Sequence, residues 1–155
     1  MILNSTATLP TVMPDLHLTV ASRLRESRER YTQNRRALVQ LLGDASQPLA
    51  IRDILDAGGG LAQSSVYRNL VVLERAGVVR RLQGPDEFAR YELEEDLTHH
   101  HHHVVCSSCG AVRDFTTSSG LERTLRRVVD EASRQTGYAL DRHTLDVFGL
   151  CRNCA

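Results

Sequence analysis

Residues 61–77 read LAQSSVYRNLVVLERAG and are the most informative segment of the chain. Within them Val66, Leu70 and Leu73 recur at the spacing of one helix face. The closing glycine is the residue type that most often ends a helix in the left-handed conformation. We therefore predict a helix over about residues 64–76, with its apolar face turned toward a core.

Polar side chains surround the start of this predicted helix. Ser64 is placed to cap the first turn, which leaves the positive helix end and the hydroxyl groups for a phosphate. Ser65, Tyr67 and Arg68 lie off the apolar face. An arginine can fork onto guanine or a phosphate, and a tyrosine can contact a thymine methyl or the backbone. On an isolated helix such residues are usually plain surface, so the DNA-binding prediction depends on a surrounding helix-turn-helix.

The neighbouring segments supply that context. Helical spacing upstream predicts three more helices, over residues 18–30, over residues 33–42, and from Pro48 to the glycines at 58–60. Downstream, residues 78–82 and 88–93 read as two strands around a turn at 83–86. Short helices followed by a β-hairpin predict a winged helix.

Length, composition and charge limit the class of protein. The chain has 155 residues, 41% of them hydrophobic and 25% charged, which is typical of a globular protein and allows two small domains. The net charge is zero, but residues 1–90 hold twelve arginines against nine acidic residues, and residues 91–155 hold seven against ten. The first half is therefore the more basic one. The chain has no lysine, so every phosphate contact must come from arginine.

Targeting signals and cysteine usage indicate the compartment. We see no apolar run near the roughly 18 residues of a membrane span, and no signal peptide in the first twenty residues. We expect a cytoplasmic protein without a membrane partner. In a reducing compartment its four cysteines are more often metal ligands or redox groups than disulfides.

The period of the sequence changes after the predicted hairpin. We expect an α+β protein, with an N-terminal winged helix-turn-helix domain and a small C-terminal α/β domain. The predicted divisions are a flexible extension at 1–17, the winged-helix domain at 18–93, a hinge at 94–98 and the second domain at 99–155. The second domain should contain strands at about 102–106, 111–115 and 139–148, and a helix at about 119–135.

Two Cys-x2-Cys pairs predict a structural zinc site. Cys106 and Cys109 are separated from Cys151 and Cys154 by 41 residues, and together they form a complete four-thiolate set. Zn–S bonds of about 2.3 Å suit this spacing. The alternatives are redox dithiols and inert buried thiols.

Five consecutive histidines, His99 to His103, precede the first cysteine. In an extended strand His99, His101 and His103 would point to one side, and His100 and His102 to the other. One strand could then serve two metal sites. Nearby carboxylates and His143 would complete ligand sets suited to Fe(II), Mn(II) or Zn(II). The alternative is a solvated histidine tract.

Together these motifs resemble the ferric uptake regulator family, over roughly residues 20–155. The resemblance is carried by SVYRNL at 65–70, RYEL at 90–93, the histidine tract, CSSCG at 106–110, His143 and the closing Cys-x2-Cys. It implies a homodimer that binds double-stranded operator DNA and represses genes of metal homeostasis when a regulatory metal is bound. It also implies that the protein is not an enzyme and has no small organic substrate.

The resemblance also implies which residues hold metal. The structural zinc ligands would be the four cysteines. The hinge sensor site would take Glu92, His101 and His103, with Asp114 as a carboxylate used by peroxide-responsive members. The further site in the dimerisation domain would take His100, His102, Glu122 and His143. The regulatory ion would be Fe2+, Zn2+ or Mn2+.

The chain departs from the family pattern at two positions. Gln47 and Pro48 stand where the family often supplies a histidine from the DNA-binding domain, and Glu94 stands near the place of a hinge cysteine. Three other functions stay open: a peroxide sensor with an Fe(II) site, a metal-dependent hydrolase, and a zinc-stapled interaction module that does not bind DNA. The hydrolase is disfavoured because the chain lacks an HExxH motif.

Overall fold

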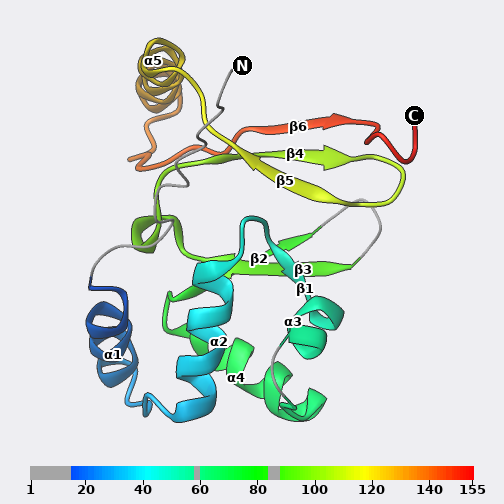
Figure 1. Cartoon of the computed structure of the whole chain (residues 1–155). Coiled ribbons are helices and arrows are strands. Elements are labelled where there is room, and N and C mark those ends of the chain that lie inside the picture. Colours follow the sequence, from blue (N-terminus) through cyan, green and yellow to red (C-terminus); the bar gives the residue numbers. More distant parts are fainter. Residues whose placement is uncertain (1–14, 58–59, 84–87) are drawn as a thin grey trace, which may run out of the picture. The chain divides into compact units, whose positions relative to one another are not determined.

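A computed structural model describes residues 15–57, 60–83 and 88–155 of the chain. These residues form two compact units, one of residues 15–83 and 88–99 and one of residues 100–155 (Figure 1). Within the described ranges, every helix is too short or too polar to cross a membrane. The elements are α1 (Leu16–Glu26), α2 (Gln33–Asp44), β1 (Leu49–Ala50), α3 (Ile51–Ala57), α4 (Gln63–Arg75), β2 (Val79–Gln83), β3 (Ala89–Leu93), the 3-10 helix η1 (Glu95–Leu97), β4 (His102–Cys106), β5 (Val112–Phe115), α5 (Ser119–Thr136) and β6 (Asp146–Gly149).

The first unit is a winged helix. Its helices pack with a three-stranded antiparallel sheet in the order β1-β3-β2 (Figure 1). Val66, Leu70 and Leu73 of α4 are at most 1% exposed, as their spacing predicted. The prediction of an α+β fold with an N-terminal winged helix is confirmed.

The start of α4 differs from the prediction by one residue. The helix begins at Gln63 after an extended Ala62, and Ser64 lies within the first turn. Ser64 is therefore not the cap, because the capping position falls on an alanine that has no side-chain acceptor. The predicted end is confirmed, since Gly77 has a φ of +65°.

The start of α3 also differs. Pro48 does not open this helix, because Leu49 and Ala50 instead pair with Tyr91 and Arg90 of β3. The helix begins only at Ile51, where the Ala50 N–H donates to the Asp53 carboxylate at 2.9 Å. A strand pairing that is distant in sequence thus overrides the local helix-start signal. The predicted glycine stop at 58–60 lies partly outside the described residues, as does the turn at 83–86.

The predicted extension and the predicted hinge both contain ordered parts of the first unit. Leu16 and His17 belong to α1 rather than to the predicted extension at 1–17, of which residues 1–14 lie outside the described ranges. The predicted hinge at 94–98 contains η1, and its Leu97 is 1% exposed within the hydrophobic core of the first unit. The acidic residues of this segment therefore mark the surface of a packed turn.

The second unit is a three-stranded sheet in the order β5-β4-β6, together with α5 (Figure 1). The central strand β4 is antiparallel to β5 and parallel to β6. Ser118 caps α5, and Gly137 ends it with a φ of +74°. The predicted strands near 102–106 and 111–115 and the predicted helix agree with these elements, but the last strand is shorter than 139–148. Both α5 and β6 are partly or fully exposed along their whole lengths.

One backbone strain in the first unit gives a stability prediction. Arg28 follows the C-cap of α1 with a φ of +59°, a left-handed conformation that costs a residue with a Cβ about 1–2 kcal/mol. Glycine removes this strain but loses more chain entropy on folding, which offsets part of the gain. We therefore expect Arg28→Gly to raise the free energy of unfolding by a net amount of about 0.5–1 kcal/mol in urea denaturation. Arg28→Ala is the control, because it removes the side chain but keeps the Cβ. An equal gain in both variants would exclude backbone strain as the cause.

Candidate metal centres

The chain presents imidazoles on two opposite sides of β4 and of the two residues before it. The ring centroids of His100 and His102 are 4.7 Å apart, and those of His101 and His103 are 5.1 Å apart. His102 and His103 are buried, with exposed fractions of 1% and 4%. These pairs agree with the alternation expected for an extended histidine tract.

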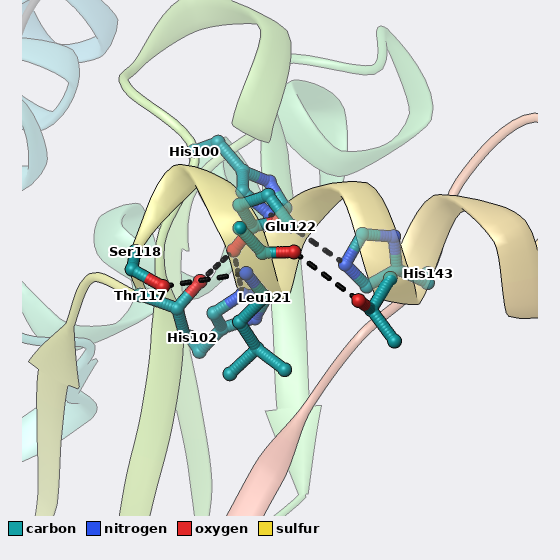
Figure 2. Close-up of polar contacts among 9 residues, drawn as sticks. His100, His102, Thr117, Ser118, Leu121, Glu122 and His143 are labelled. Carbon is teal, nitrogen blue, oxygen red and sulfur yellow. Dashed lines mark hydrogen bonds and ion pairs between the residues drawn. The ribbon is translucent and has the colours of Figure 1, made fainter.

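The first set of ligand groups, the Glu122 cluster, consists of His100, His102, Glu122 and His143. One ligand atom from each residue lies within 4.8 Å of all the others. The Glu122 carboxylate is 2.8 Å from His102 Nε2, 3.1 Å from His100 Nε2 and 3.7 Å from His143 Nε2. Figure 2 shows the three imidazoles gathered around this carboxylate.

The start of α5 positions the carboxylate. The Ser118 hydroxyl accepts the backbone N–H of Leu121 at 3.3 Å, which fixes the first turn of the helix that carries Glu122. The Thr117 hydroxyl donates to a Glu122 oxygen (Figure 2). His143 comes from the segment between α5 and β6, so three separate parts of the second unit meet here.

The protonation states of this cluster favour metal binding. The hydrogen bonds from Thr117 and then from His102 lower the pKa of Glu122 to about 2, so the carboxylate is charged at neutral pH. Burial lowers the pKa of His100 below its ordinary value of 6.5, which favours the neutral imidazole. A divalent ion requires a deprotonated carboxylate and neutral imidazoles as ligands.

One buried nitrogen tests whether a metal fits. His143 Nε2 has no hydrogen-bond partner among the described residues. A buried nitrogen without a partner is costly and calls for an explanation such as an ion. His143 Nε2 faces the Glu122 carboxylate, where an ion would satisfy both groups. The cluster therefore fits a divalent cation with three nitrogen ligands and one oxygen ligand.

The second set, the Asp114 cluster, consists of His101, His103 and Asp114 on the other side of β4. Their ligand atoms lie within 4.8 Å of one another. His103 is in register with Asp114 on β5, and its Nε2 is 3.9 Å from the Asp114 carboxylate. On its other side His103 is in register with Asp146 of β6, and its Nδ1 is 3.2 Å from that carboxylate.

Asp146 is a residue that the sequence analysis missed. A carboxylate bonded to the second nitrogen of a ligating imidazole fixes the tautomer and the orientation of the ring. Its place within the predicted last strand, at about 139–148, was the only signal in the sequence. That signal becomes informative only once β6 is known to run parallel to β4.

Glu92, the remaining predicted ligand of the hinge site, belongs to the first unit. It is 7% exposed on β3, and its carboxylate forms an ion pair with Arg80 of the neighbouring strand β2. The carboxylate therefore has a cationic partner within its own unit. Its role as a metal ligand stays a prediction.

The four cysteines converge at one end of the second sheet. Their sulfur atoms lie within 4.8 Å of one another, and those of Cys109 and Cys151 are 3.8 Å apart. Backbone N–H groups of Cys109, Cys151 and Ser108 lower the pKa of Cys106 to about 6, which favours its thiolate at neutral pH. All four are free thiols. Convergence of both pairs at one point favours a single zinc ion over two separate redox dithiols.

The predicted DNA-binding residues lie at the start of α4. Ser64, Tyr67 and Arg68 are exposed. Ser65 is only partly exposed, and its hydroxyl is 3.2 Å from the side-chain amide of Asn69, which donates to it. Three of the four residues are thus available to a ligand, while Ser65 also holds the helix together internally.

Comparison with known proteins identifies relatives over most of the chain. A model of the ferric uptake regulator family matches residues 26–148. The peroxide operon regulator of Bacillus subtilis (strain 168) is 29% identical over 136 residues, which cover 85% of this chain and 88% of that protein.

Solved structures share the fold. The ferric uptake regulator of Pseudomonas aeruginosa with manganese has a TM-score of 0.62 and 27% identity, over 84% of this chain and 96% of that chain. The ferric uptake regulator of Helicobacter pylori has a TM-score of 0.70 over 94% of this chain and 97% of that chain. At 21% identity, the second comparison supports the fold alone.

The Glu122 cluster gives a prediction for metal affinity. Glu122→Gln keeps the size of the side chain but removes its charge, so we expect the Mn2+ affinity of this cluster to fall at least about tenfold. Isothermal titration calorimetry measures this loss, and atomic absorption should show the same zinc content at the cysteines. Glu131→Gln, on the same helix but outside the cluster, is the control. An unchanged Mn2+ affinity in the Glu122 variant would contradict the assignment.

Proposed function

The chain belongs to the ferric uptake regulator family of metal-responsive transcriptional repressors, and we propose that it binds operator DNA as a homodimer when a regulatory divalent metal is bound. One observation carries this proposal. A winged helix with exposed recognition residues is joined in one chain to a strand whose imidazoles enter two metal-ligand clusters. The bound form represses transcription of metal-homeostasis genes.

DNA recognition rests on α4. Tyr67 is 45% exposed and Arg68 is also exposed, both in the first half of the helix, which is the part that reaches base edges in helix-turn-helix proteins. Arg68 can donate two parallel hydrogen bonds to a guanine or to a phosphate, and Ser64 offers a hydroxyl beside it. Operator half-sites should mirror the two-fold symmetry of the dimer.

Two kinds of ion serve different purposes. Zn2+ is the structural cofactor at the four cysteines, because four thiolates form a closed tetrahedral site. The regulatory ion is Fe2+, Zn2+ or Mn2+, which the nitrogen and oxygen ligands of the Glu122 and Asp114 clusters suit. The P. aeruginosa relative is known with manganese.

The regulatory step is a coupling between metal and DNA. We place the sensor ion at His101, His103 and Asp114, and the family resemblance adds Glu92 from the DNA-binding domain. With the ligands that the resemblance assigns, the bonds of one ion to residues of both domains restrain the orientation of the DNA-binding domain. The coupling should amount to about 1–3 kcal/mol, and linkage requires DNA to tighten metal binding by the same factor.

Exposed apolar surface of the second unit supports the homodimer. Val128 on α5, Phe148 on β6 and Leu150 just after it are each about 60% exposed, at 59%, 61% and 60%. Large exposed apolar side chains gathered on one small unit are typical of a subunit interface. A repressor acting on chromosomal DNA would work in the cytoplasm.

Removing the sensor imidazoles should uncouple metal binding from DNA binding. We expect Mn2+ to raise the affinity of the unsubstituted chain for operator DNA by about 5–150-fold, and to raise that of the His101→Ala/His103→Ala variant less than about threefold. A gel-shift titration with and without Mn2+ measures both. His99→Ala, outside both clusters, is the control.

Full metal dependence in the double variant would contradict the sensor assignment. A different outcome is that neither form binds AT-rich duplex in a fluorescence anisotropy titration at several salt concentrations. That result would favour an interaction module that does not bind DNA.

A second candidate function is peroxide sensing through iron. The B. subtilis relative is a peroxide operon regulator, and Asp114 lies in the same cluster as two histidines. In this case peroxide gives one oxygen atom to a histidine next to the iron and leaves as water.

Mass spectrometry distinguishes this candidate from a purely metal-responsive repressor. If the candidate is correct, the iron-loaded protein treated with one equivalent of peroxide should gain one oxygen on the peptide that contains His101 and His103, and should release DNA. The zinc-loaded protein is the control, because zinc has no redox chemistry. An unmodified peptide in the iron-loaded protein would exclude peroxide sensing at this site.

A further inference from the structure

Arg23 of α1 joins two other segments of the first unit. One guanidinium nitrogen donates to the backbone carbonyl of Gly77, two residues after the end of α4, the proposed recognition helix. Another donates to the carboxylate of Asp96 in η1. The Arg23 side chain is 24% exposed, and the Asp96 side chain is 65% exposed. The Arg23 side chain therefore connects η1, which precedes the histidine tract, with the C-terminal end of α4.

Other contacts fix the same segment at its two ends. The Glu94 N–H donates to the Val78 carbonyl at 2.9 Å, and Leu97 is 1% exposed within the core of the first unit. Residues 94–97 are thus held at three points, with Arg23 in the middle. The segment that was predicted to be a hinge is therefore a packed part of the first unit, and the Thr98 N–H also donates back to the Glu95 carbonyl at 3.2 Å.

The ion pair between Arg23 and Asp96 has two possible roles, to stabilise the fold or to position the segment, and the size of its contribution to stability decides between them. An exposed ion pair adds little to folding stability, and the carboxylate of Asp96 is mostly in water. The hydrophobic core already anchors the segment through Leu97. The pair does, however, link Asp96, five residues before His101, through Arg23 to the backbone of Gly77.

We propose that Arg23 and Asp96 are positioning residues that transmit metal occupancy to the recognition helix. This inference rests on the proposed function, since it requires a metal-dependent change in DNA affinity. When the chain after Leu97 is restrained by a metal at His101, the restraint is passed through Asp96 and Arg23 to Gly77, and so to α4. Without this Arg23–Asp96 clamp, Glu95 and Asp96 lose their side-chain link to Gly77, so the restraint reaches α4 only through the anchors at Glu94 and Leu97.

The test compares operator affinity with and without Mn2+, on a duplex selected from a random pool by the Mn2+-loaded full chain. Asp96→Asn keeps the shape of the side chain but removes its charge. We expect this variant to lose at least about two thirds of the metal-dependent gain in affinity, while its affinity without metal and its thermal unfolding midpoint stay those of the unsubstituted chain. By linkage, the tightening of Mn2+ binding by DNA should shrink by the same factor.

Further variants separate coupling from support of the fold. Arg23→Gln should show the same loss, and the double variant should lose no more than Asp96→Asn alone, because the two residues act as one pair. Asp56→Asn is the matched control, since its ion pair with Arg52 is confined to α3. Arg25→Gln controls for the loss of a charge on α1.

The results distinguish the two proposals. A full metal-dependent gain in Asp96→Asn, or an equal loss of affinity with and without Mn2+, would overturn the clamp and leave the proposed function in place. If the unsubstituted chain shows no metal-dependent gain, the proposed function fails, and the clamp fails with it.

Discussion

A β-strand turns successive side chains to opposite faces, and this constraint organises the chemistry of the second unit. Because β4 and the residues before it are extended, consecutive histidines are divided between two ligand clusters within a few ångströms of one backbone. Glu122 completes one cluster from a helix, and Asp114 completes the other from the adjacent strand. A shift of one residue in the register of β4 would exchange the two sets of imidazoles and separate both from their carboxylates.

The second unit has a small apolar core. Its buried side chains include the two imidazoles His102 and His103, and its apolar burial comes mainly from Val105 and Val112. A small unit of this kind needs support beyond hydrophobic burial. The four converging cysteines can supply it, because zinc binding to thiolates contributes directly to folding free energy. Exposed apolar residues on α5 and β6 offer a second source of stability if they are covered by another subunit.

The first unit distributes its contacts differently. Its core is apolar and extends from α1 to Leu97, so α4 and the start of the connection to the second unit belong to one packed body. The apolar core supplies most of the stability, and the polar contacts fix how the elements are oriented within this unit. Arg23 fixes the end of α4 to η1, and the Arg80–Glu92 pair holds the two strands of the hairpin together. In the clamp that we propose, an exposed ion pair acts in regulation while adding little to folding stability.

Local patterns in the sequence were enough to predict the helix α4, its buried face at Val66, Leu70 and Leu73, and the division of the histidines between two sides of a strand. These features depend only on the periods of helix and strand, which each segment carries by itself. The tertiary structure decided the rest: the strand at Leu49–Ala50 that displaces the start of α3, the place of Asp146 beside His103, and the attachment of residues 94–97 to the first unit. Each of these depends on a partner distant in sequence. The contact between Arg23 and Asp96 spans 73 residues, and no local period encodes where such partners meet.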